Sequence, residues 1–295
     1  TIFSGVLGFK VIMRMQRWIT MATLVLSLGY VALTINKINW SAVSKIPSGN
    51  GTAFLGALIF GVIGIGLGWV NSAADYSRYL PRSASSRGVI GWTIFGASIV
   101  PILMVIYGAL LAGSSKTLSD QIAADPIGAL TTLLPKWYLI PFAFVAILGL
   151  IGGSILDLYS SGIALVSIGL PVKRHIAASI DGGIMTIGTI YIVWIAKNFF
   201  GPFQNFLIAL GVPIAVWSAM FVADVLTRKN YNESALFDKN AEYGSWNFTS
   251  LSLLAIGSIV GWSFVSKTIG NIGIIYGLVI GFVGQIILSK KKPRK

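Results

Sequence analysis

Long apolar segments alternate with short polar ones along the whole chain of 295 residues. Lys, Arg, Pro and Asn punctuate the connections between the apolar segments. A bilayer core about 30 Å thick needs roughly 20 predominantly apolar residues in helical form. Eight stretches meet this requirement: 18–36, 52–74, 88–113, 137–170, 176–196, 200–226, 246–265 and 271–289.

The length of these stretches predicts helices and not strands. Within lipid every backbone polar group must be satisfied inside the protein, so only helices and closed barrels cross a membrane. A barrel would show segments of about ten residues with alternating hydrophobicity, whereas these stretches are continuously apolar. The pattern therefore predicts an all-α polytopic membrane protein with one transmembrane domain over residues 1–295.

The composition agrees with this class. Hydrophobic residues make up 55% of the chain and charged residues only 11%. A soluble domain carries about 25% charged residues, because its surface must be solvated. The charges of this chain are too few for such a surface, so we expect its exterior to face lipid.

The basic residues predict an orientation. With eight spans both ends lie on one side of the membrane, and 16 of the 22 Lys and Arg residues fall on that side. The other six are Lys37, Lys45, Lys116, Lys136, Lys197 and Lys267. Cytoplasmic loops carry an excess of Lys and Arg, so we expect a multi-pass protein of the plasma or inner membrane with both ends in the cytoplasm. The net charge of +13 then reflects loops facing the cytoplasm and not a nucleic-acid partner.

Several kinds of chemistry have little support in the sequence. The chain contains no cysteine, and its single histidine, His175, lies in the basic run VKRH. No catalytic set forms around one histidine, and we expect neither a metal nor a cofactor. No signal peptide is visible, and the apolar opening TIFSGVLGF is typical of the end of an earlier span. We expect the chain to be the C-terminal part of a longer protein.

A carboxylate inside a predicted span is the first candidate for function. Asp157 lies in GLIGGSILDLYSSG, together with Gly153 and Ser154. Ionisable groups inside membranes are costly and mark solute or ion pathways. A segment so rich in Gly and Ser could also unwind and offer carbonyls and hydroxyls to a ligand. The competing interpretation is close helix packing through small residues.

A second candidate lies in GVIGIGLGWVNSAADYSRYLP, where glycines lead into Gly68, Trp69 and Asn71. These glycines lie within a span of lipid length, so a dinucleotide-binding turn is a poor explanation. A helix broken near Trp69 would instead present an aromatic face to a planar solute, with packing as the alternative. Asp75 and Arg78 are spaced i,i+3, which favours a structural or gating ion pair where the span meets the cytoplasm.

Four segments of the chain resemble those of a known family. GWVNSAADYSRYLP, ILDLYSSGIALVSIGLPVKR, GVPIAVWSAMFVADVLTRKNY and GFKVIMRMQRW are similar to segments of the purine-cytosine permease branch of the nucleobase–cation symporter family. The resemblance implies a twelve-helix inverted-repeat architecture, with two five-helix repeats and two further helices. The first span here would be the fifth of the family and the last its twelfth.

The resemblance also implies where a site would lie. The family builds it from the broken first and sixth helices and from the third and eighth, of which this chain holds the sixth, around Trp69, and the eighth, around Ser154. Alignment on Tyr159 and Ser160 places Gly153, Ser154 and Asp157 near the positions that contact substrate. Relatives coupled to sodium carry hydroxyls where this chain has Gly152 and Gly153. We therefore expect coupling to H+ in preference to Na+, with Asp157 as the coupling residue.

These observations predict a secondary transporter that imports a nucleobase or a related heterocycle by cation symport. Its partners would be this small solute and the lipid bilayer, with no obligate protein partner. An amino-acid permease of the same architecture is the main alternative. A polytopic membrane enzyme would need a catalytic cluster at one membrane face, and a sensor or scaffold would usually carry a soluble domain. The sequence shows neither feature, so we expect neither an enzyme nor a sensor or scaffold.

Overall fold

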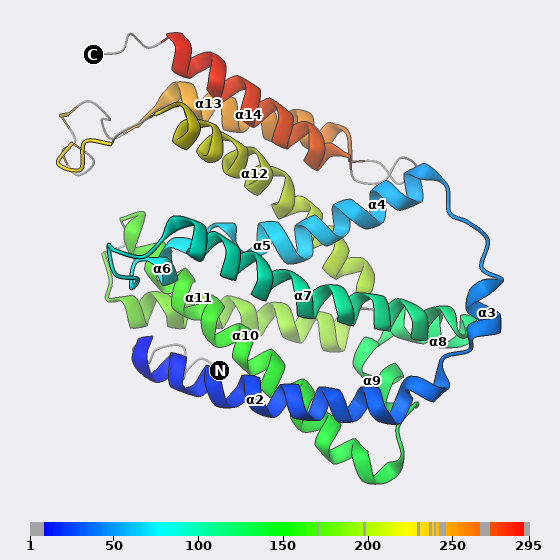
Figure 1. Cartoon of the computed structure of the whole chain (residues 1–295). Coiled ribbons are helices and arrows are strands. Elements are labelled where there is room, and N and C mark those ends of the chain that lie inside the picture. Colours follow the sequence, from blue (N-terminus) through cyan, green and yellow to red (C-terminus); the bar gives the residue numbers. More distant parts are fainter. Residues whose placement is uncertain are drawn as a thin grey trace. The chain divides into compact units, whose positions relative to one another are not determined.

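The structure of the chain is a computed structural model, which describes residues 9–169, 171–196, 199–228, 231–235, 238, 240–241, 246–265 and 272–291 (Figure 1). All regular secondary structure in these ranges is helical. The all-α prediction is confirmed. The described ranges leave out both ends of the chain, residue 170 and residue 271. The structure therefore does not bear on the last residue of the expected span 137–170 or on the first residue of the expected span 271–289.

Seven helices in the described ranges are long and apolar enough to cross a membrane. They are Lys10–Lys37, Gly51–Val70, Ser86–Gly113, Lys136–Ser167, Arg174–Ile195, Phe200–Thr227 and Gly273–Lys290. Each coincides with one of the expected spans, although the first begins some eight residues earlier. Apolar runs therefore located these helices correctly.

The eighth expected span is shorter than the sequence predicted. Residues 246–265 form α13 (Phe248–Ser263), a helix of 16 residues. At 1.5 Å per residue this helix is about 24 Å long, less than the bilayer core of about 30 Å. The helix begins only at Phe248, because the side chain of Asn247 accepts a hydrogen bond from the amide of Ser250 and caps the N-terminus of the helix.

The chain divides into two compact units. Unit 1 comprises residues 1–47 and 74–202, and unit 2 comprises residues 48–73 and 203–295. The helices that begin in unit 1 are α2 (Phe9–Thr34), η1 (Ile35–Lys37), α3 (Trp40–Ser44), α7 (Ser86–Gly113), α8 (Lys116–Ala124), α9 (Pro126–Thr131), η3 (Lys136–Tyr138), α10 (Leu139–Ser167), α11 (Arg174–Ile190), η4 (Tyr191–Ile195) and the first residues of α12 (Phe200–Thr227). Those of unit 2 are α4 (Gly51–Gly61), η2 (Val62–Leu67), α5 (Gly68–Val70), α13 and α14 (Gly273–Lys291), with the rest of α12, while α6 (Ala73–Ser77) begins at the boundary.

In unit 1, α10 packs against α2 and α11. Tyr30, Leu111 and Phe142 belong to one buried cluster, and Ile12, Ile155 and Tyr159 form another. The second cluster lies beside the segment of α10 that carries Asp157. The position of this carboxylate is therefore fixed by packing on the opposite side of its own helix.

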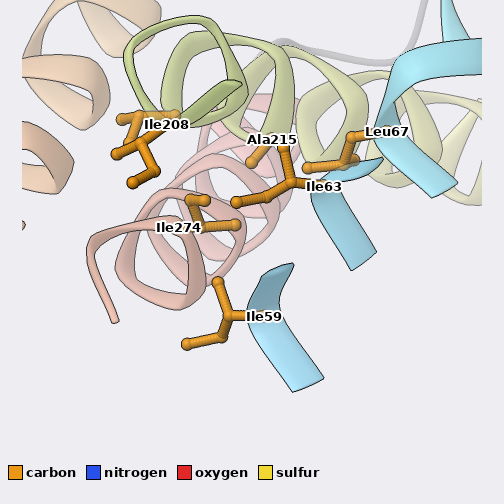
Figure 2. Packing of buried hydrophobic residues seen from close by; sticks show 7 residues of the cluster. Ile59, Ile63, Leu67, Ile208, Ala215 and Ile274 are labelled. Atoms are coloured by element: carbon orange, nitrogen blue, oxygen red, sulfur yellow. The ribbon is translucent and has the colours of Figure 1, made fainter. Parts of the chain in front are cut away.

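In unit 2, α12 is the central helix, and half of its most apolar window is buried. Ile59, Ile63 and Leu67 pack against Ile208 and Ala215 of α12, and Ile274 of α14 closes the cluster (Figure 2). Ile59, Ile63 and Leu67 recur every four residues and so line one face of their segment. This spacing leaves the other face of the segment outside the core.

Two features of the helices bear on the expected site. The span 51–70 contains a π-helical turn at Val62–Leu67, and a turn at residues 71–72 ends the helix just after Trp69 and separates α5 from α6. Such π turns occur mostly as single turns inside α-helices and frequently at functional sites. The unwinding expected within Gly149–Ser161, in contrast, is wrong, since α10 is continuous from Leu139 to Ser167.

Candidate functional site

Gly68, Trp69 and Asn71 lie in unit 2, directly after the π-helical turn. All three are exposed, and the Trp69 side chain keeps 43% of its surface accessible. A Cβ atom added at Gly64 or Gly66 would meet nothing within 4 Å. The face of the broken helix that carries Trp69 is therefore open, while its opposite face is fixed in the core of unit 2.

Gly153, Ser154 and Asp157 lie in unit 1 on one face of α10, since i,i+3 and i,i+4 positions of a helix are neighbours. The Ser154 hydroxyl donates to the carbonyl of Leu150 at 2.8 Å. A Cβ atom at Gly153 would meet nothing within 4 Å. The Gly153 position is thus an open gap beside a hydroxyl and a carboxylate.

Gly152 has a different role from Gly153. A Cβ atom at Gly152 would come within 3.2 Å of Gln16 Oε1 and 3.3 Å of Ile19 Cγ2 on α2. The Gln16 amide also donates to the Gly152 carbonyl at 2.6 Å. Both interpretations of the small residues are therefore represented: Gly152 allows close packing of α2 on α10, and Gly153 leaves space.

The Asp157 side chain is exposed, and no residue of the described chain forms a hydrogen bond or an ion pair with it. It lies within a helix of membrane-spanning length. A charge in contact with acyl chains is costly, so such residues face the protein interior or a water-filled cavity. We therefore expect the face of α10 that carries Asp157 to point to the protein interior or to a water-filled cavity.

The segment that follows the turn at residues 71–72 is attached to α10 beside Asp157. The Tyr76 hydroxyl donates to the carbonyl of Leu156 at 3.1 Å. Burial raises the pKa of the Tyr76 phenol above its ordinary value, so the hydroxyl keeps the proton that it donates. The site residues of α10 therefore lie next to Tyr76 within unit 1.

Arg78 completes this attachment, and its expected ion pair with Asp75 is wrong. The Arg78 guanidinium donates to the hydroxyls of Tyr159 and Tyr79, each at 3.0 Å, and these two hydroxyls are 2.7 Å apart. The ion pairs among the described residues are Lys116–Asp120 and Arg228–Asp224. The guanidinium reaches across to α10 because hydroxyl acceptors are available there, and the hydrogen bond to Tyr159 raises the pKa of Arg78 above its ordinary value.

Tyr159 is the centre of this cluster, with 3% of its surface exposed. The guanidinium carbon of Arg174, at the start of α11, lies 5.0 Å from the centre of its ring. An arginine over an aromatic face is attracted by the ring electrons. Tyr76, Arg78, Tyr79, Tyr159 and Arg174 thus connect three segments of unit 1 close to Asp157.

Two parts of this arrangement were not predicted from the sequence. One is the hydrogen-bonding role of the tyrosines in DYSRY, although their spacing beside Arg78 favours a shared hydroxyl network. The other is Asp181, although it is a carboxylate inside the expected span 176–196. In the described ranges, no group of three or more His, Asp or Glu side chains is arranged to hold a metal ion.

Comparison with known proteins identifies the family. The model of a family described as permease for cytosine/purines, uracil, thiamine, allantoin matches residues 1–287. The chain belongs to this permease family. This membership confirms the resemblance of the quoted segments, and the apolar helices indicate a multi-pass membrane protein.

One curated relative of this permease is a Bacillus subtilis (strain 168) protein, YxlA, whose name classes it with the purine-cytosine permeases. The two sequences are 23% identical over 251 residues, which cover 78% of this chain and 53% of the relative. The chain therefore spans about half the length of the curated relative that it matches. No solved structure matches the chain.

Proposed function

We propose that this permease is a secondary transporter that imports a nucleobase or a related heterocycle, such as cytosine, a purine or an allantoin-like ureide. The observation that carries the proposal is the family match over residues 1–287. The exposed Trp69 on an interrupted helix supports it, because an open aromatic face stacks on planar heterocycles. From the family resemblance we infer that Gly68 and Asn71, and likewise Gly153 and Ser154, contribute polar contacts and space for a solute.

Coupling to protons is part of the proposal. Asp157 is an exposed carboxylate in a helix of membrane-spanning length, and a carboxylate can take up and release a proton as its surroundings change. Gly152 and Gly153 have no side-chain oxygen to offer a hard cation such as Na+. A proton bound on one side and released on the other would drive symport by alternating access around a midplane site.

The proposed architecture is that implied by the family resemblance. We infer one transporter domain with two inverted five-helix repeats and two further helices, in the plasma or inner membrane. The 16-to-6 asymmetry of basic residues supports cytoplasmic ends. This orientation requires that α13 crosses the membrane despite its 16 residues.

Competition of solute uptake tests the proposed substrate class. Cells that produce the full-length protein would be given radiolabelled cytosine or adenine, with unlabelled nucleobases or amino acids in excess. We expect nucleobases to reduce uptake and amino acids to leave it unchanged. Reduction by amino acids alone would contradict the proposal and favour an amino-acid permease.

A further inference from the structure

The hairpin of α10 and α11 brings two helices of membrane-spanning length into close contact. A Cβ atom added at Gly162 would lie 3.0 Å from the Ala178 Cβ and 3.1 Å from the Arg174 carbonyl oxygen. Ala177 and Ala178 are buried to 0% and 1% exposure. Small residues on both helices therefore allow the backbones to approach, as they do in membrane helix pairs.

A carboxylate of α11 is held against α10 beside this contact. The hydroxyl of Ser161, the neighbour of Gly162, donates to Oδ2 of Asp181 at 2.7 Å. Asp181 lies about two turns from the start of α11 and is partly buried. This hydrogen bond fixes the position of the Asp181 carboxylate against α10. Asp181 is thus a second acidic group inside a helix of membrane-spanning length.

Ser161 also connects Asp181 to Asp157. Asp157 lies four residues before Ser161, so the two side chains are neighbours on one face of α10. The hydrogen bond from Ser161 therefore places Asp181 beside the face of α10 that carries Asp157. Between them in sequence, Ser160 is 5% exposed.

The other described elements around Asp157 carry one further carboxylate, Asp75 of α6. The same helix contributes Tyr76, whose hydroxyl donates to the Leu156 carbonyl. The basic residue of α11 at this end, Arg174, lies over the Tyr159 ring. Helix α2 contributes the uncharged Gln16 at Gly152, while its residues Arg14 and Arg17 are exposed. Asp181 is the carboxylate that a hydrogen bond holds against α10, one turn from Asp157.

We propose that Asp181 is a positioning residue for proton coupling, which sets how readily Asp157 binds its proton. A negative charge close to a carboxylate disfavours a second ionised carboxylate, so the pair retains a proton more readily than either group alone. On binding, the proton forms one O–H bond with Asp157 and cancels its charge; on release, that bond breaks and the proton returns to water. This inference rests on the proposed proton coupling.

The test is the pH profile of uptake by the full-length protein in proteoliposomes at a fixed membrane potential. For Asp181→Asn we expect the midpoint of the profile to move to lower pH by about one unit, because loss of the negative charge weakens proton binding at Asp157. Asp181→Glu should restore the wild-type midpoint. Ser161→Ala should shift it in the same direction by less, since Asp181 keeps its charge but loses the hydrogen bond that holds it against α10.

Asp120→Asn is the matched control, because Asp120 lies in an exposed ion pair with Lys116 and should leave the profile unchanged. If the wild type depends on pH and Asp157→Asn removes that dependence, unchanged midpoints in Asp181→Asn and Ser161→Ala would overturn this inference alone. If the wild type shows no dependence on pH, proton coupling itself fails and the inference falls with it. Should Asp181→Asn not fold, Ser161→Ala and Asp181→Glu still decide the outcome.

Discussion

At the scale of single residues, Trp69 is the side chain whose role is easiest to measure. Stacking of an aromatic ring on a base contributes about 1–3 kcal/mol. Trp69→Ala in the full-length protein should therefore weaken nucleobase binding about 5- to 150-fold, since 1.4 kcal/mol corresponds to a factor of ten. Trp69→Phe should retain part of the affinity, because it keeps an aromatic face.

Equilibrium binding of radiolabelled solute to purified protein would measure this effect. Trp92→Ala is the control, because Trp92 is 75% exposed on α7, far along the chain from the site residues. Unchanged affinity in a folded Trp69→Ala variant would leave packing as the role of this tryptophan.

Tyr159 gives a second prediction at this scale. Tyr159→Phe removes a hydroxyl that accepts from Arg78 and is hydrogen-bonded to Tyr79. Each hydrogen bond contributes about 0.5–1.5 kcal/mol, so the free energy of unfolding should fall by about 1–2 kcal/mol. Thermal unfolding in detergent would report the loss. Tyr276→Phe should have little effect, because the ring that stacks on Phe264 is kept; equal losses in both variants would contradict the role of the cluster.

The site was predictable from sequence only in part. Asp157 and Trp69 stand out because an ionisable group and an internal tryptophan are conspicuous in apolar spans. The hydroxyl contacts of Arg78 were not predictable, because they join residues about 80 positions apart. Asp181 was predictable as a candidate, because it is also an ionisable residue inside an apolar span. Its contact with Ser161 was not, because that contact depends on the close approach of the helices at Gly162.

At the scale of elements, glycines decide how closely the helices of unit 2 pack. A Cβ atom at Gly281 of α14 would overlap the backbone oxygen of Val216 on α12. Extra atoms in a packed interior cost about 1–3 kcal/mol. Gly281→Ala should therefore lower the thermal stability of the protein in detergent.

Gly91→Ala on α7 is the matched control, since its added Cβ would meet nothing within 4 Å. This variant should be unchanged or more stable, because alanine is favoured over glycine in a helix by about 0.5–1 kcal/mol. A Gly281→Ala variant as stable as Gly91→Ala would contradict the packing of α14 against α12.

Apolar runs predicted the positions of seven helices well, because lipid requires length and hydrophobicity before all else. They did not predict the shorter α13, whose start is fixed by the Asn247 cap. They also did not distinguish two glycine-rich segments. Residues 62–67 form a π turn, whereas residues 149–161 keep a regular helix, in which Gly152 packs against Gln16.

At the scale of the whole molecule, the orientation of the spans can be tested directly. The chain has no cysteine, so single introduced cysteines can be labelled without background. Lys45→Cys and Arg82→Cys should react from opposite sides of the membrane. Ser234→Cys and Lys267→Cys should do the same if α13 crosses the membrane. Labelling of either pair from one side would contradict the proposed topology.

Proton symport, as proposed for this permease, can be tested by nucleobase uptake into proteoliposomes that contain the full-length protein, under two separate gradients. One set of vesicles has a pH gradient, acidic outside, without sodium, and the other has an inward sodium gradient without a pH difference. With proton symport we expect accumulation above equilibrium in the first set alone, and accumulation driven by sodium alone would contradict it.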